Sequence, residues 1–169
     1  MKILLLSDNH AYCDDAILKH AEWADEIWHA GDWLNLDLYD ELLRLDKPIR
    51  AVWGNADPHE ARLLFPENLS FTIQGLRFLM THIGGYPGKF PARVKALLQQ
   101  YQPHVFICGH SHILRVMRAP EFNNMLCMNP GACGLQGFHQ IRTALRFSIE
   151  KGQLTQLEVV EFGARKEAL

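Results

Sequence analysis

The chain has 169 residues, of which 48% are hydrophobic and 21% charged, and its formal net charge is −2 at pH 7. A chain of this length buries roughly 70% of its unfolded surface on folding, so we expect one domain over residues 1–169. The sequence contains no long basic segment. This composition disfavours long nucleic acid and anionic membranes as main partners.

The N-terminal apolar segment, residues 3–6, ends at Ser7. It is too short for a signal-peptide core or a membrane span, so we expect a cytoplasmic protein that does not associate with membranes. The four cysteines form no CxxC pair, which favours free, buried thiols. A contact between Cys108 and Cys127 is left open.

Apolar strands alternate with amphipathic helices in the first third of the chain. This alternation indicates parallel βαβ units. The predicted strands are residues 2–7, 26–31 and 49–54, and the predicted helices are 14–25 and a segment around 38–45.

Strands predominate in the remainder of the chain. Gln74-Gly75 and Lys151-Gly152 each separate two predicted strands and are typical of tight hairpins. This mixture of elements predicts two packed sheets with helices outside. The predicted strands are 69–74, 76–82, 104–108, 113–119, 125–129, 143–150 and 154–162, with one helix at 91–101.

Five apolar segments end in side chains that can bind a metal ion. In open α/β sheets, ligands bind at the carboxyl ends of the strands, so we expect these side chains to meet in one crevice. The candidate residues are Asp8, His10, Asp32, Asn55, His82, His110 and His112.

Each segment alone also has a structural explanation. Asp8 could cap a helix, and Asp32 or Asn55 could lie in a turn that uses the preceding glycine. The pair His110 and His112 has little use in packing, because residues i and i+2 of an extended segment face the same side. Five such endings together favour a metal site over five independent caps and turns.

The candidate donors favour divalent transition ions. Carboxylate and imidazole groups suit Mn, Fe, Zn or Ni, and the lack of a thiolate cluster argues against a structural zinc site. Seven donors are too many for one tetrahedral ion. Two divalent ions that share a bridging aspartate fit the set, with Mn²⁺ favoured.

These motifs resemble, in order, those of the calcineurin-like metallophosphoesterase superfamily. The family pattern D-x-H, G-D, G-N, isolated His and G-H-x-H corresponds here to residues 8–10, 31–32, 54–55, 82 and 109–112. The match spans residues 1 to about 135. Its compact spacing is similar to the small YfcE-type phosphodiesterase branch, which also includes the eukaryotic retromer scaffold subunit.

The resemblance implies an α/β fold, a four-layer α/β/β/α sandwich of two packed mixed sheets with flanking helices. It also implies a dinuclear metal centre in which Asp32 bridges the two ions. The implied ligands are Asp8, His10 and His112 for one ion, and Asn55, His82 and His110 for the other.

The implied function is hydrolysis of a phosphodiester or small phosphomonoester by a hydroxide bound at the dinuclear centre. Asp32, Asn55 and His10 are the predicted catalytic residues. The alternative is a non-catalytic protein-binding scaffold on the same fold, which the complete ligand set disfavours. The expected partner is a small phosphate ester, and a homo-oligomer is left open.

The sequence departs from the family pattern at two positions. Ala56 stands where many larger relatives have the histidine that protonates the leaving group, and Ala132 stands where a serine is common. His59 could replace the missing acid, but a surface position is favoured. The group that protonates the leaving group is therefore left open.

Several other residues have two interpretations. Lys89 and Arg93 could contact a phosphate or face solvent, and Trp33 and Phe138 could lie in the core, at an interface or beside the site. We expect structural or surface roles for four further histidines, which are His20, His29, His104 and His139.

Overall fold

The structure is a computed structural model that describes residues 1–165. The first sheet consists of β1 (Lys2–Leu6), β2 (Glu26–His29), β3 (Ile49–Ala51), β9 (Ile141–Glu150) and β10 (Gln153–Ala164). The second consists of β4 (Asn68–Ile73), β5 (Leu76–Thr81), β6 (Val105–Ile107), β7 (Leu114–Ala119) and β8 (Met125–Pro130). The helices are α1 (Asp15–Trp23), α2 (Asp37–Leu43), α3 (His59–Leu64) and α4 (Ala92–Tyr101), with a 3-10 turn η1 (Pro120–Phe122).

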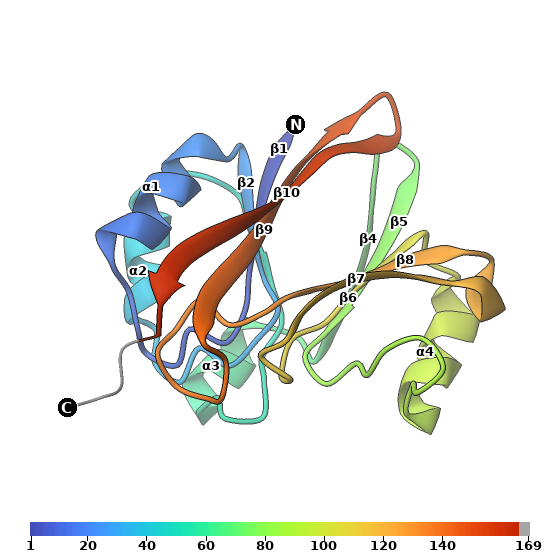
Figure 1. The fold of residues 1–169 in the computed structure, drawn as a ribbon, viewed down its shortest axis with the longest axis horizontal. Helices are drawn as coiled ribbons and strands as arrows, with labels where there is room; N and C mark the ends of the chain where they lie inside the picture. Colours follow the sequence, from blue (N-terminus) through green and yellow to red (C-terminus); the bar gives the residue numbers. More distant parts are fainter. Residues whose placement is uncertain (166–169) are drawn as a thin grey trace.

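The two sheets pack face to face, with helices on both outer faces (Figure 1). Their strand orders are β10-β9-β1-β2-β3 and β4-β5-β6-β8-β7, and each sheet combines parallel and antiparallel pairs. Helices α1, α2 and α3 contribute to the core on the outer face of the first sheet, while α4 packs on the second. The predicted four-layer sandwich is confirmed.

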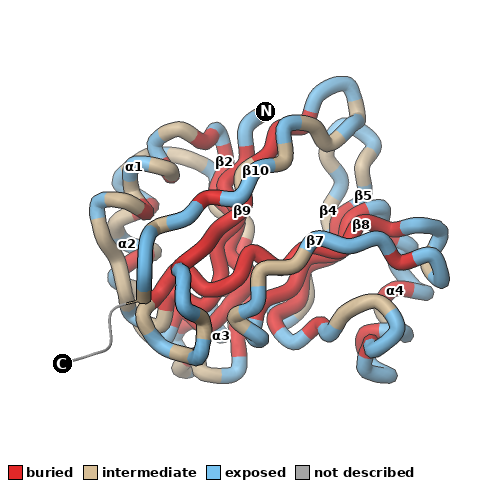
Figure 2. The backbone as a smooth tube through the Cα atoms, viewed as in Figure 1, coloured by how far each residue is buried: buried red, intermediate tan, exposed pale blue. Residues whose placement is uncertain are grey.

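The sequence of β1 determines which of its side chains face each layer of the sandwich. Ile3 and Leu5 point between the two sheets, whereas Leu4 and Leu6 point to the outer face, toward Ile17 of α1. Because both faces of β1 are covered, the strand is apolar at each of these positions. Figure 2 shows the resulting continuous buried layer inside both sheets.

The predicted strands and helices are present, and within residues 1–165 α3 is the only helix of four or more residues that was not predicted. Its sequence HEARLL is too short to show a helical repeat, and Leu63 and Leu64 are exposed while Ala61 is buried. Both predicted hairpin turns have positive φ at their two central residues, as type I′ turns require. None of the helices within residues 1–165 is long and apolar enough to cross a membrane.

Asp14 joins the start of α1 to β9. Its Oδ1 accepts a hydrogen bond from the N–H of Ile17 at 3.0 Å, so Asp14 is the N-cap of α1. Its Oδ2 accepts from Nη2 of Arg142 at 2.8 Å and from the Tyr12 hydroxyl at 3.1 Å. Burial alone would raise the pKa of Asp14, but these hydrogen bonds and the Arg142 charge hold it below the usual 3.8.

We expect Asp14→Ala to lower the free energy of unfolding by about 1–2 kcal/mol at neutral pH, because it removes a helix cap and an ion pair. A carboxyl whose pKa is lowered by folding stabilises the protein above its unfolded pKa, and this contribution is lost as the pH falls through the folded value. Urea unfolding of wild type and the Asp14→Ala protein should therefore show this difference in the free energy of unfolding at neutral pH, and a smaller difference near pH 2.5. A difference that does not change with pH, or an equal effect of Asp15→Ala at the exposed neighbouring position, would contradict this assignment.

Candidate metal centre

The predicted ligands all lie in loops at the carboxyl ends of parallel strands. Donor atoms from six of them form two groups, and within each group all atoms lie within 4.8 Å of one another. Each group takes residues from both sheets, so the site forms where the ends of the two sheets meet. The groups are Asp8, His10 and His112, and Asp32, His82 and His110.

Asp8 is the buried carboxylate of the first group. Its Oδ2 accepts hydrogen bonds from the Ser7 hydroxyl at 2.5 Å and from the N–H of His110 at 3.0 Å. Its Oδ1 lies 3.3 Å from Nε2 of His112 and 3.9 Å from Nε2 of His10. The two imidazole nitrogens are themselves 3.1 Å apart. Three donor atoms therefore face one small volume.

Asp32 belongs to the second group and also faces a histidine of the first. Its Oδ1 accepts a hydrogen bond from the N–H of Ala56 at 2.8 Å. Its Oδ2 lies 3.2 Å from Nε2 of His82 in the second group and 3.8 Å from Nε2 of His10 in the first. Ala56 thus contributes a backbone donor that orients the carboxylate, and the remaining oxygen faces one histidine of each group.

Two unpartnered atoms test whether this set suits a cation. Within residues 1–165, Oδ1 of Asp8 and Nε2 of His82 are buried and have no hydrogen-bond partner. Nδ1 of His82 donates to the carbonyl oxygen of Ala30 at 2.7 Å, so the Nε2 lone pair faces the carboxylates. Burying a carboxylate oxygen and a lone pair without a partner is costly. A divalent cation would satisfy both atoms, so the residues fit a metal ion.

The pKa shifts at the site favour the forms that bind metal at three of four positions. Burial lowers the pKa of His10 and His110, which keeps both imidazoles neutral. Burial acts to raise the pKa of Asp32, but the adjacent His82 brings it below 3.8. Burial acts to lower the pKa of His82, but Asp32 and Asp8 raise it above 6.5. Because a metal ion binds the neutral imidazole, the raised pKa of His82 opposes metal binding at this position.

The glycines of the predicted motifs allow the loops to approach one another. A Cβ on Gly54 would collide with the backbone nitrogen and the carboxylate of Asp32, and a Cβ on Gly109 would collide with the Ser7 hydroxyl. These close contacts leave no room for a side chain. They explain why Asn55 and His110 both follow a glycine.

Two supporting residues were not predicted from the sequence. Asp57 is buried, and its carboxylate accepts hydrogen bonds from the N–H groups of Gly54, Asp32 and Leu34 at 2.7, 3.1 and 2.8 Å. It therefore links the Asp32 loop to the Asn55 loop. The sequence feature that could have identified Asp57 is its position two residues after the predicted ligand Asn55. Burial raises the pKa of Asp57.

Asn129 supports the loop of residues 109–112 in a similar way. Its Nδ2 donates to the carbonyl oxygen of Gly109 at 2.7 Å and to the Ser111 hydroxyl at 3.1 Å, while its Oδ1 accepts from the N–H of Gly131 at 3.0 Å. Asn129 begins the segment Asn-Pro-Gly at residues 129–131, which directly precedes Ala132. Asn129 therefore ties the loop that carries the predicted ligands His110 and His112 to the end of β8.

The seventh predicted ligand, Asn55, lies beside His82 in a small pocket that Arg93 also lines. The Arg93 guanidinium donates to Asn68 Oδ1 at 2.9 Å and to the Thr81 hydroxyl at 3.2 Å. It also lies 3.4 Å from a Glu67 carboxylate oxygen. Arg93 is therefore held by these neighbours at the edge of the site.

The structure places two histidines that were expected to be structural or at the surface, and three residues whose position the sequence left open. His29 is buried and stacks on buried Trp33, with ring centroids 3.6 Å apart. His139 packs its edge against the ring of the predicted ligand His112. Phe138 is fully exposed, and exposed His59 begins α3. All four cysteines are free, as expected, although Cys13 is only partly buried.

The sequence and the fold place this chain among the phosphoesterases. The sequence matches the calcineurin-like phosphoesterase superfamily domain over residues 1–152, and the chain belongs to this superfamily. It is 29% identical over 148 residues to Phosphodiesterase MJ0936 of Methanocaldococcus jannaschii. This alignment covers 79% of this chain and 84% of the relative.

Solved structures share the same fold. A novel archaeal phosphodiesterase superposes with a TM-score of 0.72 at 24% identity, covering 96% of this chain and all of that chain. Vps29 of Entamoeba histolytica in complex with Zn²⁺ superposes with a TM-score of 0.73 at 18% identity, with the same coverage. At these identities the likeness shows the fold alone.

Proposed function

We propose that this protein is a metal-dependent phosphoesterase that hydrolyses a phosphodiester or a small phosphomonoester at a dinuclear metal centre. Two observations carry the proposal: Asp32 of the second donor group also faces a histidine of the first, and two buried donor atoms have no hydrogen-bond partner. Membership of the phosphoesterase superfamily and the phosphodiesterase relative support the same reaction class.

The proposed ligands follow from the two groups and the position of Asn55. Asp32 is shared between the ions, because its Oδ2 lies near a histidine of each group. Mn²⁺ suits this mixture of carboxylate, amide and imidazole donors, with Fe, Zn and Ni as alternatives. The first ion takes Asp8, His10 and His112, and the second takes Asn55, His82 and His110.

When bound, two divalent ions supply the Lewis acidity that activates water at neutral pH and offsets the charge of the phosphoryl oxygens. Asp32 is oriented for its shared position by the Ala56 N–H. Asn55 is a neutral ligand, so it leaves more positive charge for the substrate, and its NH₂ group can donate to a phosphoryl oxygen. His10 faces both carboxylates and completes the wall around the phosphoryl group. Positioning and electrostatic complementarity provide most of the rate.

Ala56 affects the choice of substrate. It has no side chain that can donate a proton to the leaving oxygen, and exposed His59 lies three residues further along at the start of α3. A leaving group of low pKa needs little protonation in the transition state. We therefore expect aryl esters to be hydrolysed faster than alkyl esters, which parallel assays of phenyl and ethyl phosphate esters would measure.

The proposal is tested by removing all metal and then restoring Mn²⁺. We expect calorimetry to show two bound ions per chain, and the loaded protein to hydrolyse bis-p-nitrophenyl phosphate, p-nitrophenyl phosphate or both. Failure to bind ions would contradict the metal centre itself. Two bound ions without turnover of either ester would contradict the proposed phosphoesterase activity and favour the scaffold alternative.

A further inference from the structure

Buried His29, which is not among the proposed metal ligands, contacts the residues on both sides of Asp32. Its Nδ1 accepts a hydrogen bond from the N–H of Gly31 at 3.1 Å. Its ring stacks on Trp33, with the two ring planes 21° apart. Gly31 and Trp33 are the immediate neighbours of Asp32 in the chain. One side chain therefore holds the backbone both before and after this carboxylate.

The backbone at Asp32 needs such support because its conformation is strained. Asp32 has a φ of 60°, in the left-handed region that is disfavoured for residues with a side chain. Such conformations persist only where the surrounding contacts impose them. Trp33 is itself held in place, because its Nε1 donates to the carbonyl oxygen of Val52 at 3.3 Å and its ring also stacks on Phe65. His29 thus packs against a ring that other neighbours fix.

The loop before Asp32 also contacts ligands of both donor groups. The carbonyl oxygen of Gly31 accepts a hydrogen bond from the N–H of Asp8 at 2.9 Å. The carbonyl oxygen of Ala30 accepts one from Nδ1 of His82 at 2.7 Å. Asp8 belongs to the first group and His82 to the second. A shift of this loop would therefore displace donors of both groups.

Packing alone does not explain a histidine at position 29. The ring is fully buried, and its Nε2 has no hydrogen-bond partner in the part of the chain that the structure describes. Burial lowers the pKa of His29 well below 6.5, so the imidazole is neutral, and because Nδ1 accepts, the proton is on Nε2. A buried N–H without an acceptor is costly, whereas phenylalanine could stack on Trp33 without this cost. What histidine adds is the acceptor for Gly31.

We propose that His29 is a positioning residue of the metal centre, which keeps the Asp32 carboxylate within reach of both ions by holding Gly31 and Trp33. The inference rests on the proposed dinuclear centre, and it adds a residue that touches neither the ions nor the substrate. Because Asp32 is shared, loss of the His29 contacts should weaken the binding of both ions. A residue that only filled the core would leave the metal affinity of the folded protein unchanged.

The test is a calorimetric titration of the metal-free protein with Mn²⁺, in wild type and two variants. His29→Phe keeps a ring that can stack on Trp33 but has no acceptor for the Gly31 N–H. His29→Asn loses the ring, but its Oδ1 is bonded to Cγ as Nδ1 is in histidine, so the acceptor is kept. We expect His29→Phe to weaken both ions by about 10–100-fold, as is usual for groups that orient metal ligands. His29→Asn should recover part of this loss.

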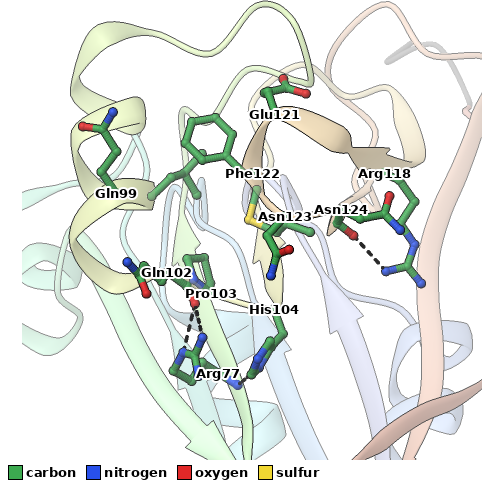
Figure 3. A pocket seen from close by; sticks show the side chains of 12 residues that line it. Arg77, Gln99, Gln102, Pro103, His104, Arg118, Glu121, Phe122, Asn123 and Asn124 are labelled. Atoms are coloured by element: carbon green, nitrogen blue, oxygen red, sulfur yellow. Dashed lines mark hydrogen bonds between the residues drawn. The ribbon is translucent and has the colours of Figure 1, made fainter.

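His104→Phe is the matched control. Nδ1 of His104 also accepts a hydrogen bond from a backbone N–H, that of Arg77 at 3.0 Å (Figure 3). However, His104 precedes β6, whereas the predicted ligand His110 follows this strand. The same substitution therefore removes the same kind of hydrogen bond away from the metal loops, and it should leave the Mn²⁺ affinity unchanged. Urea unfolding without metal shows whether each variant is folded.

Equal Mn²⁺ affinity of a folded His29→Phe protein and wild type would overturn the role of His29 and leave the dinuclear centre in place. Tighter binding by His29→Phe than by His29→Asn would also overturn it, because the ring would then matter more than the acceptor. A wild-type protein that binds no ion would contradict the proposed function together with this inference. Independently of any variant, ¹⁵N NMR of the wild-type imidazoles should show an unprotonated Nδ1 at His29, and a proton on this atom would overturn the assignment.

Discussion

Asp32→Ala is expected to lower Mn²⁺-dependent hydrolysis of phosphate esters by about 1,000-fold or more. Loss of an outer partner of a metal ligand typically costs about 10–100-fold, and Asp32 is proposed to contact both ions directly. Its Oδ2 lies 3.2 Å from Nε2 of His82 and 3.8 Å from Nε2 of His10, closer to each than Oδ1 of Asp8, which lies 3.9 Å from both. Initial rates and the number of bound ions should be measured on the same preparations.

Asp40→Ala is the matched control, because Asp40 is an exposed aspartate on α2. We expect this protein to keep the activity and the metal content of wild type. Thermal unfolding of both variants without metal shows whether the Asp32→Ala protein is folded. Wild-type turnover by a folded Asp32→Ala protein would exclude Asp32 as the bridging ligand.

Asp57→Ala should have the largest effect on stability among the substitutions near the site. It would leave the N–H groups of Gly54, Asp32 and Leu34 without their acceptor. Each buried donor without a partner costs about 1–3 kcal/mol, so we expect the free energy of unfolding to fall by roughly 3 kcal/mol or more. Metal affinity should also fall, by about 10–100-fold, because the Asp32 loop loses its support.

Urea unfolding and calorimetric titration with Mn²⁺ measure these two effects. Asp57→Asn keeps an acceptor oxygen and the shape of the side chain, so we expect it to fold and to lose less of both quantities. Glu60→Ala, at an exposed acidic position of α3, is the control. An Asp57→Ala protein with wild-type metal affinity would show that the two loops hold their positions independently of this carboxylate.

The sequence predicted the sheets and the metal donors for related reasons. An apolar run such as residues 3–6 marks a strand covered on both faces, and a polar residue such as Asp8 directly after it marks a loop at the strand end. Parallel strands then bring such loops together, as the two donor groups show. The pattern requires no knowledge of which strands are neighbours.

Other features depend on tertiary contacts that no local pattern reveals. Helix α3 buries only Ala61, so its sequence shows no apolar face. In the sequence, Asp57 cannot be distinguished from an ordinary turn residue. Its three hydrogen-bond donors come from two separate loops, so no local pattern reveals them. Trp33 follows a predicted ligand, but the structure buries it against His29. In these cases the deciding partners lie elsewhere along the chain.

The division of each donor group between the two sheets has a mechanical consequence. An ion held by Asp8 and His112, or by Asp32 and His82, cross-links the two layers at one edge of their interface. Ligand binding to the native state alone adds to stability in proportion to the logarithm of ligand concentration. The resistance of this sandwich to heat should therefore rise with the supply of metal, and separation of the sheets should begin at the edge farthest from the ions.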